Sequence, residues 1–372
     1  MAREQEIRSY LHTIPETGFN EHRTAAFLAD ALTRAGYEVT TGLGGKTGVV
    51  GVLDSGVPGP VMGIRSDIDA LGHMVDGQPV AIHSCGHDGH MAMALAAAEE
   101  IIRDNIVRRG RLKIIFQPAE EIGLGAYSIL DSGVLDDVDY LIGQHVRPIE
   151  EAHNKQASPA MYYSASATWE VDIVGQRAHA ARPHLGHNAL DAAAAAIAAV
   201  NAIHCDPRRS FSIKATRCIC DAGATNAIPD IARLAFDLRA QDNDTMERME
   251  AAGRTAIEHA AAAYECRATI NETKMLPAAE YSEEMIDFLR DCITEVLGED
   301  GLLPPLSTPG GEDFCHYVKA KPDLKVGFFG LGCNLTPGLH APDMTFDPDA
   351  LTDGKNILIT AVRKLLGEDS VK

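Results

Sequence analysis

The sequence predicts an α/β fold in which a doubly wound, mostly parallel sheet carries a smaller inserted α+β domain. Short apolar runs typical of buried strands alternate with stretches of helical periodicity at both ends of the chain. Near residue 166 the pattern changes to strands in which apolar and polar residues alternate. The length of 372 residues is large for one core, so we expect two domains.

The outer parts of the chain supply the elements of the larger domain. Buried strands are predicted, in chain order, at 48–53, 61–65, 112–116, 139–143 and 326–331. One or two helices are predicted over residues 3–36, with a break at 14–19 and clear helical spacing at 24–32. Further helices are predicted at 91–102, 283–297 and 351–366. Because strands and helices alternate, we expect parallel pairing and a doubly wound sheet in this domain.

The middle of the chain predicts a separate module over residues 166–273. Its strands are expected at 168–174, 210–214 and 232–239, and its helices at 189–200 and 245–263. This β-α-β-β-α-β-like order is typical of a ferredoxin-like module. The larger domain is therefore expected to consist of residues 1–165 and 274–372.

Composition narrows the class of protein. A formal net charge of −20 argues against nucleic acid or an anionic membrane as the main partner. No apolar stretch reaches the length of a membrane span, and no basic-then-apolar leader opens the chain. The eight cysteines are scattered rather than dense, so we expect reduced thiols and a cytoplasmic location.

The stretch from His83 to His90 carries the densest group of metal-binding residue types. Cys85 and His87 lie on a glycine-rich turn that opens a helix, and they are the first two predicted metal ligands. The alternative is that Cys85 is a small buried apolar residue of the core without a ligand role. We interpret Asp88 and His90 as capping and supporting groups rather than ligands.

Acids and histidines also follow the buried strands. Asp69, Glu120 and Glu121 come after two of them, where the carboxyl edge of an α/β sheet builds its sites. The side chains of adjacent glutamates are expected to point in different directions, so one can bind metal while the other acts as a general base. His145 and His340 each follow a buried strand, and Asp69 is expected to orient a ligand or the base.

These motifs together resemble the metallo-amidohydrolase subfamily of the aminoacylase/carboxypeptidase-type metallopeptidases. That group includes hippurate hydrolases, indole-acetyl-amino-acid hydrolases and p-aminobenzoyl-glutamate hydrolases. The resemblance covers nearly the whole chain. The motifs that carry it are Tyr10 to Phe19, Ser66 to Leu71, Cys85-Gly-His-Asp-Gly-His90, Pro118-Ala-Glu-Glu121, Gln144-His145, Gly311-Glu-Asp-Phe314 and Leu339-His340.

The resemblance implies a centre of two divalent ions, manganese or zinc. The implied ligands are Cys85, His87, Glu121, His145 and His340. Glu120 is the implied general base for attack of a metal-bound hydroxide on an amide. The implied substrate is a small N-acyl or N-aroyl amino acid, and segments 133–139 and 186–190 look most like the p-aminobenzoyl-glutamate hydrolases.

The inserted module resembles the lid and dimerisation domain of that subfamily, which implies a homodimer. His179, His184, Asn226 and Arg239 match lid positions that help to bind the substrate carboxylate or the oxyanion. The alternative is that these histidines belong to a polar loop without a role.

Two departures and four alternatives accompany this interpretation. One departure is Gly310-Gly311 before Glu312, which leaves the late loop free of side chains. Relatives usually have proline where this chain has Gly72, followed by His73 and a shortened run to the Cys85 turn. Within the enzyme class, a dipeptidase-like enzyme or an aromatic-amine aminohydrolase would use the same centre. Two alternatives are not enzymes. One is an inactive relative that acts as a binding subunit, and the other is a protein in which the metal only holds loops together.

Overall fold

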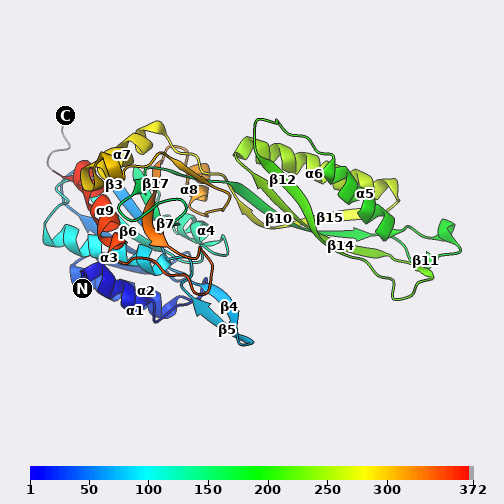
Figure 1. Ribbon diagram of the computed structural model, residues 1–372, viewed down its shortest axis with the longest axis horizontal. Helices are drawn as coiled ribbons and strands as arrows, with labels where there is room; N and C mark the ends of the chain where they lie inside the picture. Colours follow the sequence, from blue (N-terminus) through cyan, green and yellow to red (C-terminus); the bar gives the residue numbers. More distant parts are fainter. Residues whose placement is uncertain (368–372) are drawn as a thin grey trace. The chain divides into compact units, whose positions relative to one another are not determined.

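The computed structural model describes residues 1–367 and separates into two compact units (Figure 1). Unit 1 comprises Met1–Tyr162, Glu280–Ser307 and Asp313–Lys372, and unit 2 comprises Tyr163–Ala279 and Thr308–Glu312. The second boundary falls later than the expected residue 273 because the last strand of unit 2 runs to Leu276.

Unit 2 also includes a short segment that the sequence pattern did not indicate. The backbone N–H of Ser164 donates to the carbonyl of Gly310 at 3.1 Å, and the Ser164 hydroxyl donates to the carbonyl of Thr308 at 3.2 Å. These bonds attach residues 308–312 to the start of the inserted module.

A seven-stranded sheet forms the centre of unit 1. Its strands, in spatial order, are β1 (Glu38–Leu43), β2 (Gly48–Asp54), β6 (Arg111–Gln117), β3 (Val61–Asp67), β7 (Tyr140–Pro148), β17 (Lys325–Leu335) and β8 (Ala157–Ser158). The four central strands, β6, β3, β7 and β17, are parallel, whereas the outer pairings are antiparallel. The predicted α/β class with a largely parallel central sheet is therefore confirmed.

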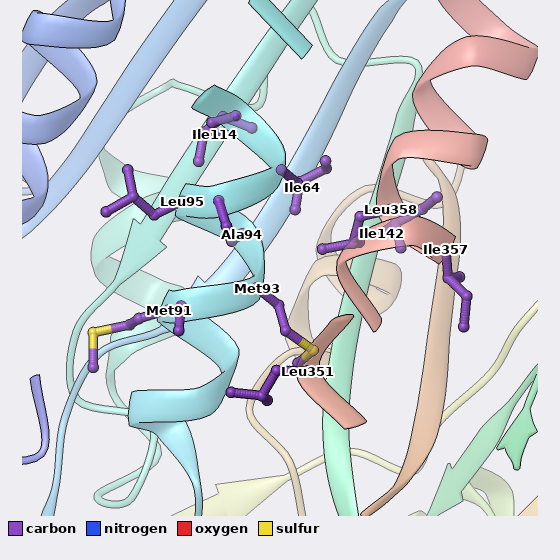
Figure 2. Close-up of a cluster of buried hydrophobic side chains, with 14 of the residues drawn as sticks. Ile64, Met91, Met93, Ala94, Leu95, Ile114, Ile142, Leu351, Ile357 and Leu358 are labelled. Carbon is purple, nitrogen blue, oxygen red and sulfur yellow. The ribbon is translucent and has the colours of Figure 1, made fainter. Parts of the chain in front are cut away.

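Helices cover this sheet and bury its apolar side chains. They are α1 (Arg3–Leu11), α2 (His22–Ala35), α3 (His87–Arg103), α4 (Gly125–Asp131), α7 (Glu283–Leu297), α8 (Cys315–Ala320) and α9 (Ala350–Leu366), with a 3₁₀ turn at Glu299–Gly301. Figure 2 shows Met93 of α3 and Leu358 of α9 packed beside Ile64 and Ile142 of the central strands. Because α3 lies among the sheet, α1, α2 and α9, it is apolar almost all round.

A β-hairpin and helix α4, both in unit 1, were not predicted from the sequence. A hairpin consists of β4 (Leu71–Val75) and β5 (Gln78–Ile82). Its turn residues, Asp76 and Gly77, have φ angles of 50° and 75°, as a type I′ turn requires. Helix α4 was also missed.

Two further short strands, β9 (Met161–Tyr163) and β16 (Leu306–Thr308), lie where the chain passes between units.

Unit 2 has its own sheet and its own core. The strands β12 (Phe211–Ile219), β14 (Ile231–Ala240), β10 (Ala165–Val174) and β15 (Arg267–Leu276) pair antiparallel in that order. Helices α5 (Ala189–Asn201) and α6 (Asn243–Ala263) cover it, and the small elements are β11 (Ala178–His179), the 3₁₀ turn Pro183–Leu185 and β13 (Ala227–Ile228). The β-α-β-β-α-β order matches the prediction, and alternate residues such as Trp169, Val171 and Ile173 are buried in the core.

Among residues 1–367, no helix combines the length and the apolar character needed to cross a membrane.

Candidate metal centre

The carboxyl ends of the central strands bring the predicted residues together in unit 1. Strands β3 and β6 pair in parallel until Asp67 lies opposite Gln117, and the chain then continues from each strand into Asp69 and Glu120. His145 lies within β7 rather than after it, because β7 remains paired with β17 as far as Pro148. The position differs from the expected one, but the edge of the sheet is the same.

The turn that carries Cys85 depends on Gly86. Gly86 has a φ of 89° and is the N-cap of α3, so His87 is the first helical residue. A Cβ atom at position 86 would lie 2.4 Å from Cγ2 of Val146 on β7. The glycine therefore lets the Cys85 turn approach the strand that carries His145.

His87 is held in one orientation by Asp69. Its Nδ1 lies 3.0 Å from the carbonyl oxygen of Asp69 and 3.2 Å from its carboxylate, so the proton belongs on Nδ1. Its Nε2 is buried and has no hydrogen-bond partner within residues 1–367. The same Asp69 carboxylate accepts the backbone N–H of Glu121 at 3.0 Å, so one residue positions two predicted ligands.

His145 presents its other nitrogen to Cys85. Its Nδ1 lies 2.6 Å from the carbonyl oxygen of Val146, and its Nε2 lies 3.4 Å from Sγ of Cys85. Donation from Nδ1 to the carbonyl leaves Nε2 able to accept a metal ion.

His340 approaches the same group from the loop after β17. Its Nε2 lies 3.6 Å from a carboxylate oxygen of Glu121, and its side chain is 56% exposed. The backbone of His340 has a φ of 67°, which is uncommon for a residue with a side chain.

The spacing of these atoms fits metal ions. Cys85, His87 and His145 form one group, and Cys85, Glu121 and His340 form another, with the ligand atoms of each group within 4.8 Å of one another. Ligands of one tetrahedral zinc ion stand about 3.3–3.8 Å apart, given metal–ligand bonds of about 2.0–2.3 Å. The 3.4 Å and 3.6 Å separations above agree with that value. Because Cys85 belongs to both groups, the donors fit two neighbouring divalent ions.

Glu120 and Glu121 face the same imidazole, contrary to the expectation that they point apart. Oxygens of Glu120 and Glu121 lie 4.0 and 3.8 Å from Nε2 of His87. Extended backbone would point adjacent side chains to opposite sides, but β6 ends at Gln117 and Ala119 has a φ of 56°. The chain therefore turns sharply before the two acids and brings both to the centre.

Asp88 and His90 each contact neighbouring protein groups, as supporting residues would, but the expected capping role is not seen because Gly86 is the N-cap of α3 and no side chain caps it. Asp88 is buried and accepts from Arg8 Nε at 2.9 Å, while His12 Nδ1 lies 2.7 Å away. His90 contacts an Asp67 oxygen through Nδ1 at 2.7 Å and accepts the backbone N–H of Val146 through Nε2 at 2.9 Å. Since both nitrogens of His90 are engaged, the neighbouring group of Asp67, His87 and His90 does not supply three free ligand atoms.

The surroundings of several predicted ligands favour their protonated forms in the metal-free protein. Burial and the charge of Glu121 raise the pKa of Cys85 well above its usual value, and burial raises the pKa of Glu121 to about 7. Burial lowers the pKa of His87, but the charge of Asp67 and the hydrogen bond to Asp69 outweigh it, and the net pKa is raised. Burial and the nearby His90 lower the pKa of His145, so that ring is neutral.

A buried polar network behind the centre was not predicted. Arg65 donates to Gln117, Asp67 and Asp313 at 2.8, 2.8 and 2.9 Å. Asp313 also accepts the backbone N–H of Ala126 at 2.9 Å. The network ties the ends of β3 and β6 to a residue 248 positions later in the chain.

The four predicted substrate-binding residues all lie exposed in unit 2: His179, His184, Asn226 and Arg239. His179 is on β11, and its strand partner Ala227 directly follows Asn226. Arg239 is near the far end of β14, roughly 26 Å along the strand from Ile231 at about 3.3 Å per residue. Within unit 2 of a single chain, Arg239 therefore does not converge with His179 and Asn226.

Comparison with known proteins identifies the family to which the chain belongs. Residues 63–364 match the model of peptidase family M20/M25/M40. The chain is 32% identical to hippurate hydrolase of Campylobacter jejuni over 308 residues, which cover 79% of each protein. It is 29% identical to N-acetyl-L-cysteine deacetylase of Bacillus subtilis, over 97% of this chain and 87% of that protein.

The fold also matches a solved relative. The structure of the YXEP protein of Bacillus subtilis, described as a dinuclear metal-binding peptidase of family M20, superposes with a TM-score of 0.81. That match covers 98% of both chains at 26% identity. The chain described here is a member of peptidase family M20/M25/M40, and it is a hydrolase that acts on amide bonds.

Proposed function

We propose that this protein hydrolyses the amide bond of an N-acyl or N-aroyl amino acid at a centre of two divalent ions, manganese or zinc. The observation that carries the proposal is the pair of ligand groups that share Cys85 and have both Glu120 and Glu121 beside them. Hippurate hydrolase and N-acetyl-L-cysteine deacetylase, two relatives, have names that give substrates of this class.

The proposed ligands are Cys85, His87, Glu121, His145 and His340. Thiolate and imidazole suit zinc, and a set that also contains a carboxylate suits manganese, so the donor types allow either ion. Ions bound there would polarise the amide carbonyl and lower the pKa of a water molecule.

Glu120 is the proposed general base. Its carboxylate lies 4.0 Å from Nε2 of His87, beside the ligands yet outside the two ligand groups that share Cys85. It can therefore accept a proton from the attacking water and transfer it to the departing nitrogen. Asp69 fixes the ring of His87 and the backbone of Glu121 during this exchange.

Unit 2 is the proposed lid and dimerisation domain. His179, Asn226 and Arg239 are too far apart along unit 2 to form one anion site in a single chain, which supports a homodimer in which they act at different sites. Strand β12 lies at one edge of its sheet with Ile219 59% exposed, and such an edge can pair with a second copy. Sedimentation should give twice the monomer mass of 39.9 kDa, and a monomer at micromolar concentration would contradict the homodimer.

The eight cysteines are free thiols, which supports the proposed cytoplasmic location.

A substrate panel tests the proposed reaction. Manganese-loaded and zinc-loaded protein would be offered N-acetyl and N-benzoyl amino acids, dipeptides with a free amino group, and aromatic amines. We expect hydrolysis of the N-acyl or N-aroyl compounds and its loss after chelation. Turnover of dipeptides alone would favour the peptidase alternative, release of ammonia from the amines would favour the aminohydrolase, and no turnover at all would favour the inactive relative.

A further inference from the structure

Ser84 connects Cys85 and His340, the two proposed ligands that lie on loops. It immediately precedes Cys85, and its backbone carbonyl accepts the N–H of His340 at 2.7 Å. The residue before one ligand therefore holds the backbone of another, although the two ligands lie 255 positions apart in the sequence. A shift of Ser84 would move Cys85 and His340 together.

His340 has particular need of such a contact. Its φ of 67° is costly for a residue with a side chain, so its neighbours must hold it in that conformation. Packing contributes little to its side chain, which is 56% exposed. The bond from Ser84 acts on the backbone at the strained residue itself.

Ser84 is in turn held by His73. The Nε2 atom of His73 lies 2.8 Å from the Ser84 hydroxyl, and Ser84 is buried. His73 belongs to β4 and pairs with Val80 of β5, in the hairpin that the type I′ turn at Asp76 and Gly77 closes. The hairpin thus presents a partly buried imidazole from a defined backbone rather than from an irregular loop.

We propose that His73 is a positioning residue, which acts through Ser84 to hold Cys85 and His340 in place for the metal ions. The inference rests on the proposed function, because it takes these two residues as ligands. In this role His73 acts through the hydroxyl of Ser84. Its effect is on how long the ions stay bound.

The test measures loss of zinc from the folded, loaded protein to an excess of a chromogenic chelator. The variants His73→Leu and Ser84→Ala remove the hydrogen bond, while His73→Gln places an amide nitrogen close to the position of Nε2. Val80→Thr is the matched control, because Val80 is the cross-strand partner of His73 and is 37% exposed.

We expect about tenfold faster zinc loss in His73→Leu and in Ser84→Ala, as is usual when a residue that orients a ligand is removed. His73→Gln and Val80→Thr should keep the parental rate. The double variant His73→Leu/Ser84→Ala should lose zinc no faster than either single variant, because each removes the same bond.

Parental release in His73→Leu, or additive effects in the double variant, would overturn the proposal. A purely structural role would lower the melting temperature of metal-free His73→Leu and leave zinc release at low temperature unchanged, which also overturns it. Failure of the proposed function looks different. In that case the parental protein hydrolyses no amide, while the release rates of the variants still differ.

Discussion

Glu120 and Glu121 are neighbours in sequence and face the same imidazole, yet they have different surroundings. Glu121 belongs to the group with Cys85 and His340, and its backbone N–H is fixed by Asp69. Glu120 is also close to His87 but is not in that group. Glu120 and Glu121 also form a group with His87, so the proposed roles of ligand for Glu121 and base for Glu120 rest on the nearness of Glu121 to Cys85 and His340.

This division predicts opposite outcomes for two isosteric variants. Glu120→Gln should lower kcat by about 10²–10⁴-fold, the usual contribution of a general base, and keep both ions. Glu121→Gln should lose metal, because an amide is a weaker ligand than a carboxylate. Steady-state kinetics with metal analysis by mass spectrometry would measure both, and a Glu120→Gln protein with most of its activity would show that the base is another residue.

Raised pKa values at the centre predict that metal binding depends on pH. Because the pKa of Glu121 is about 7 and those of Cys85 and His87 are raised, these groups hold protons in the metal-free protein near neutrality. Metal must displace the protons, so affinity rises with pH between about 6 and 8, by up to about tenfold per pH unit for each proton released. Calorimetry in buffers of different ionisation enthalpy would count these protons, and a pH-independent affinity would show that the ligands are already deprotonated.

At the scale of elements, the centre depends on how the Cys85 turn meets β7. Gly86 combines a left-handed φ of 89° with the close approach to Val146. Gly45, in the turn between β1 and β2, has a φ of 71°, and a Cβ atom there would meet no heavy atom of residues 1–367 within 4 Å. Comparing alanine substitutions at Gly45 and Gly86 therefore separates the cost of backbone strain from the cost of a steric clash.

Gly45→Ala should lower the free energy of unfolding by about 1 kcal/mol through strain alone. Gly86→Ala should cost about 1–3 kcal/mol more, because the new methyl group would have to displace β7 or the turn. It should also lower zinc affinity, since the turn carries Cys85. Urea unfolding of the metal-free proteins gives the comparison, and equal losses in the two variants would show that the approach to Val146 is unimportant.

The sequence predicts most of the elements that build the site, but not the β4–β5 hairpin or the buried polar network. Long buried runs such as β3 and β6 are unambiguous because their apolar character matches full burial in a sheet. The β4–β5 hairpin was missed although Asp76-Gly77 between apolar runs is a hairpin signal. The network from Arg65 to Asp313 could not be read, because nothing local in the sequence indicates a contact across 248 residues.

At the scale of the molecule, all five proposed ligands belong to unit 1 and none to unit 2: Cys85, His87, Glu121, His145 and His340. Unit 2 has a separate core around Trp169. Metal should therefore stabilise unit 1 without strengthening the core of the other unit.

Hydrogen exchange can test that separation. Zinc loading should slow exchange in segments 83–90, 119–122 and 338–341, because bound metal opposes the local openings that release each ligand. Exchange in the central strands of unit 2, β10 and β14, should stay unchanged. Equal protection of those strands would mean that metal binding is coupled to the core of unit 2.

The hydrophobic period changes near residue 166, close to residue 163, where unit 2 begins. The sequence pattern does not indicate that residues 308–312 also belong to unit 2, because their attachment rests on hydrogen bonds between Ser164 and the backbone of Thr308 and Gly310. Bonds to backbone carbonyls do not depend on the side chain of the accepting residue and leave no signature in the sequence.

The central claim is that two ions held by unit 1 support hydrolysis of an amide. The most direct measurement adds manganese in steps to metal-free protein and follows hydrolysis of the best N-acyl or N-aroyl amino acid of the panel. We expect the rate to reach its plateau at two equivalents per chain, and Glu120→Gln to bind the same two equivalents with almost no turnover. A plateau at one equivalent, or hydrolysis that persists in fully chelated protein, would contradict the claim.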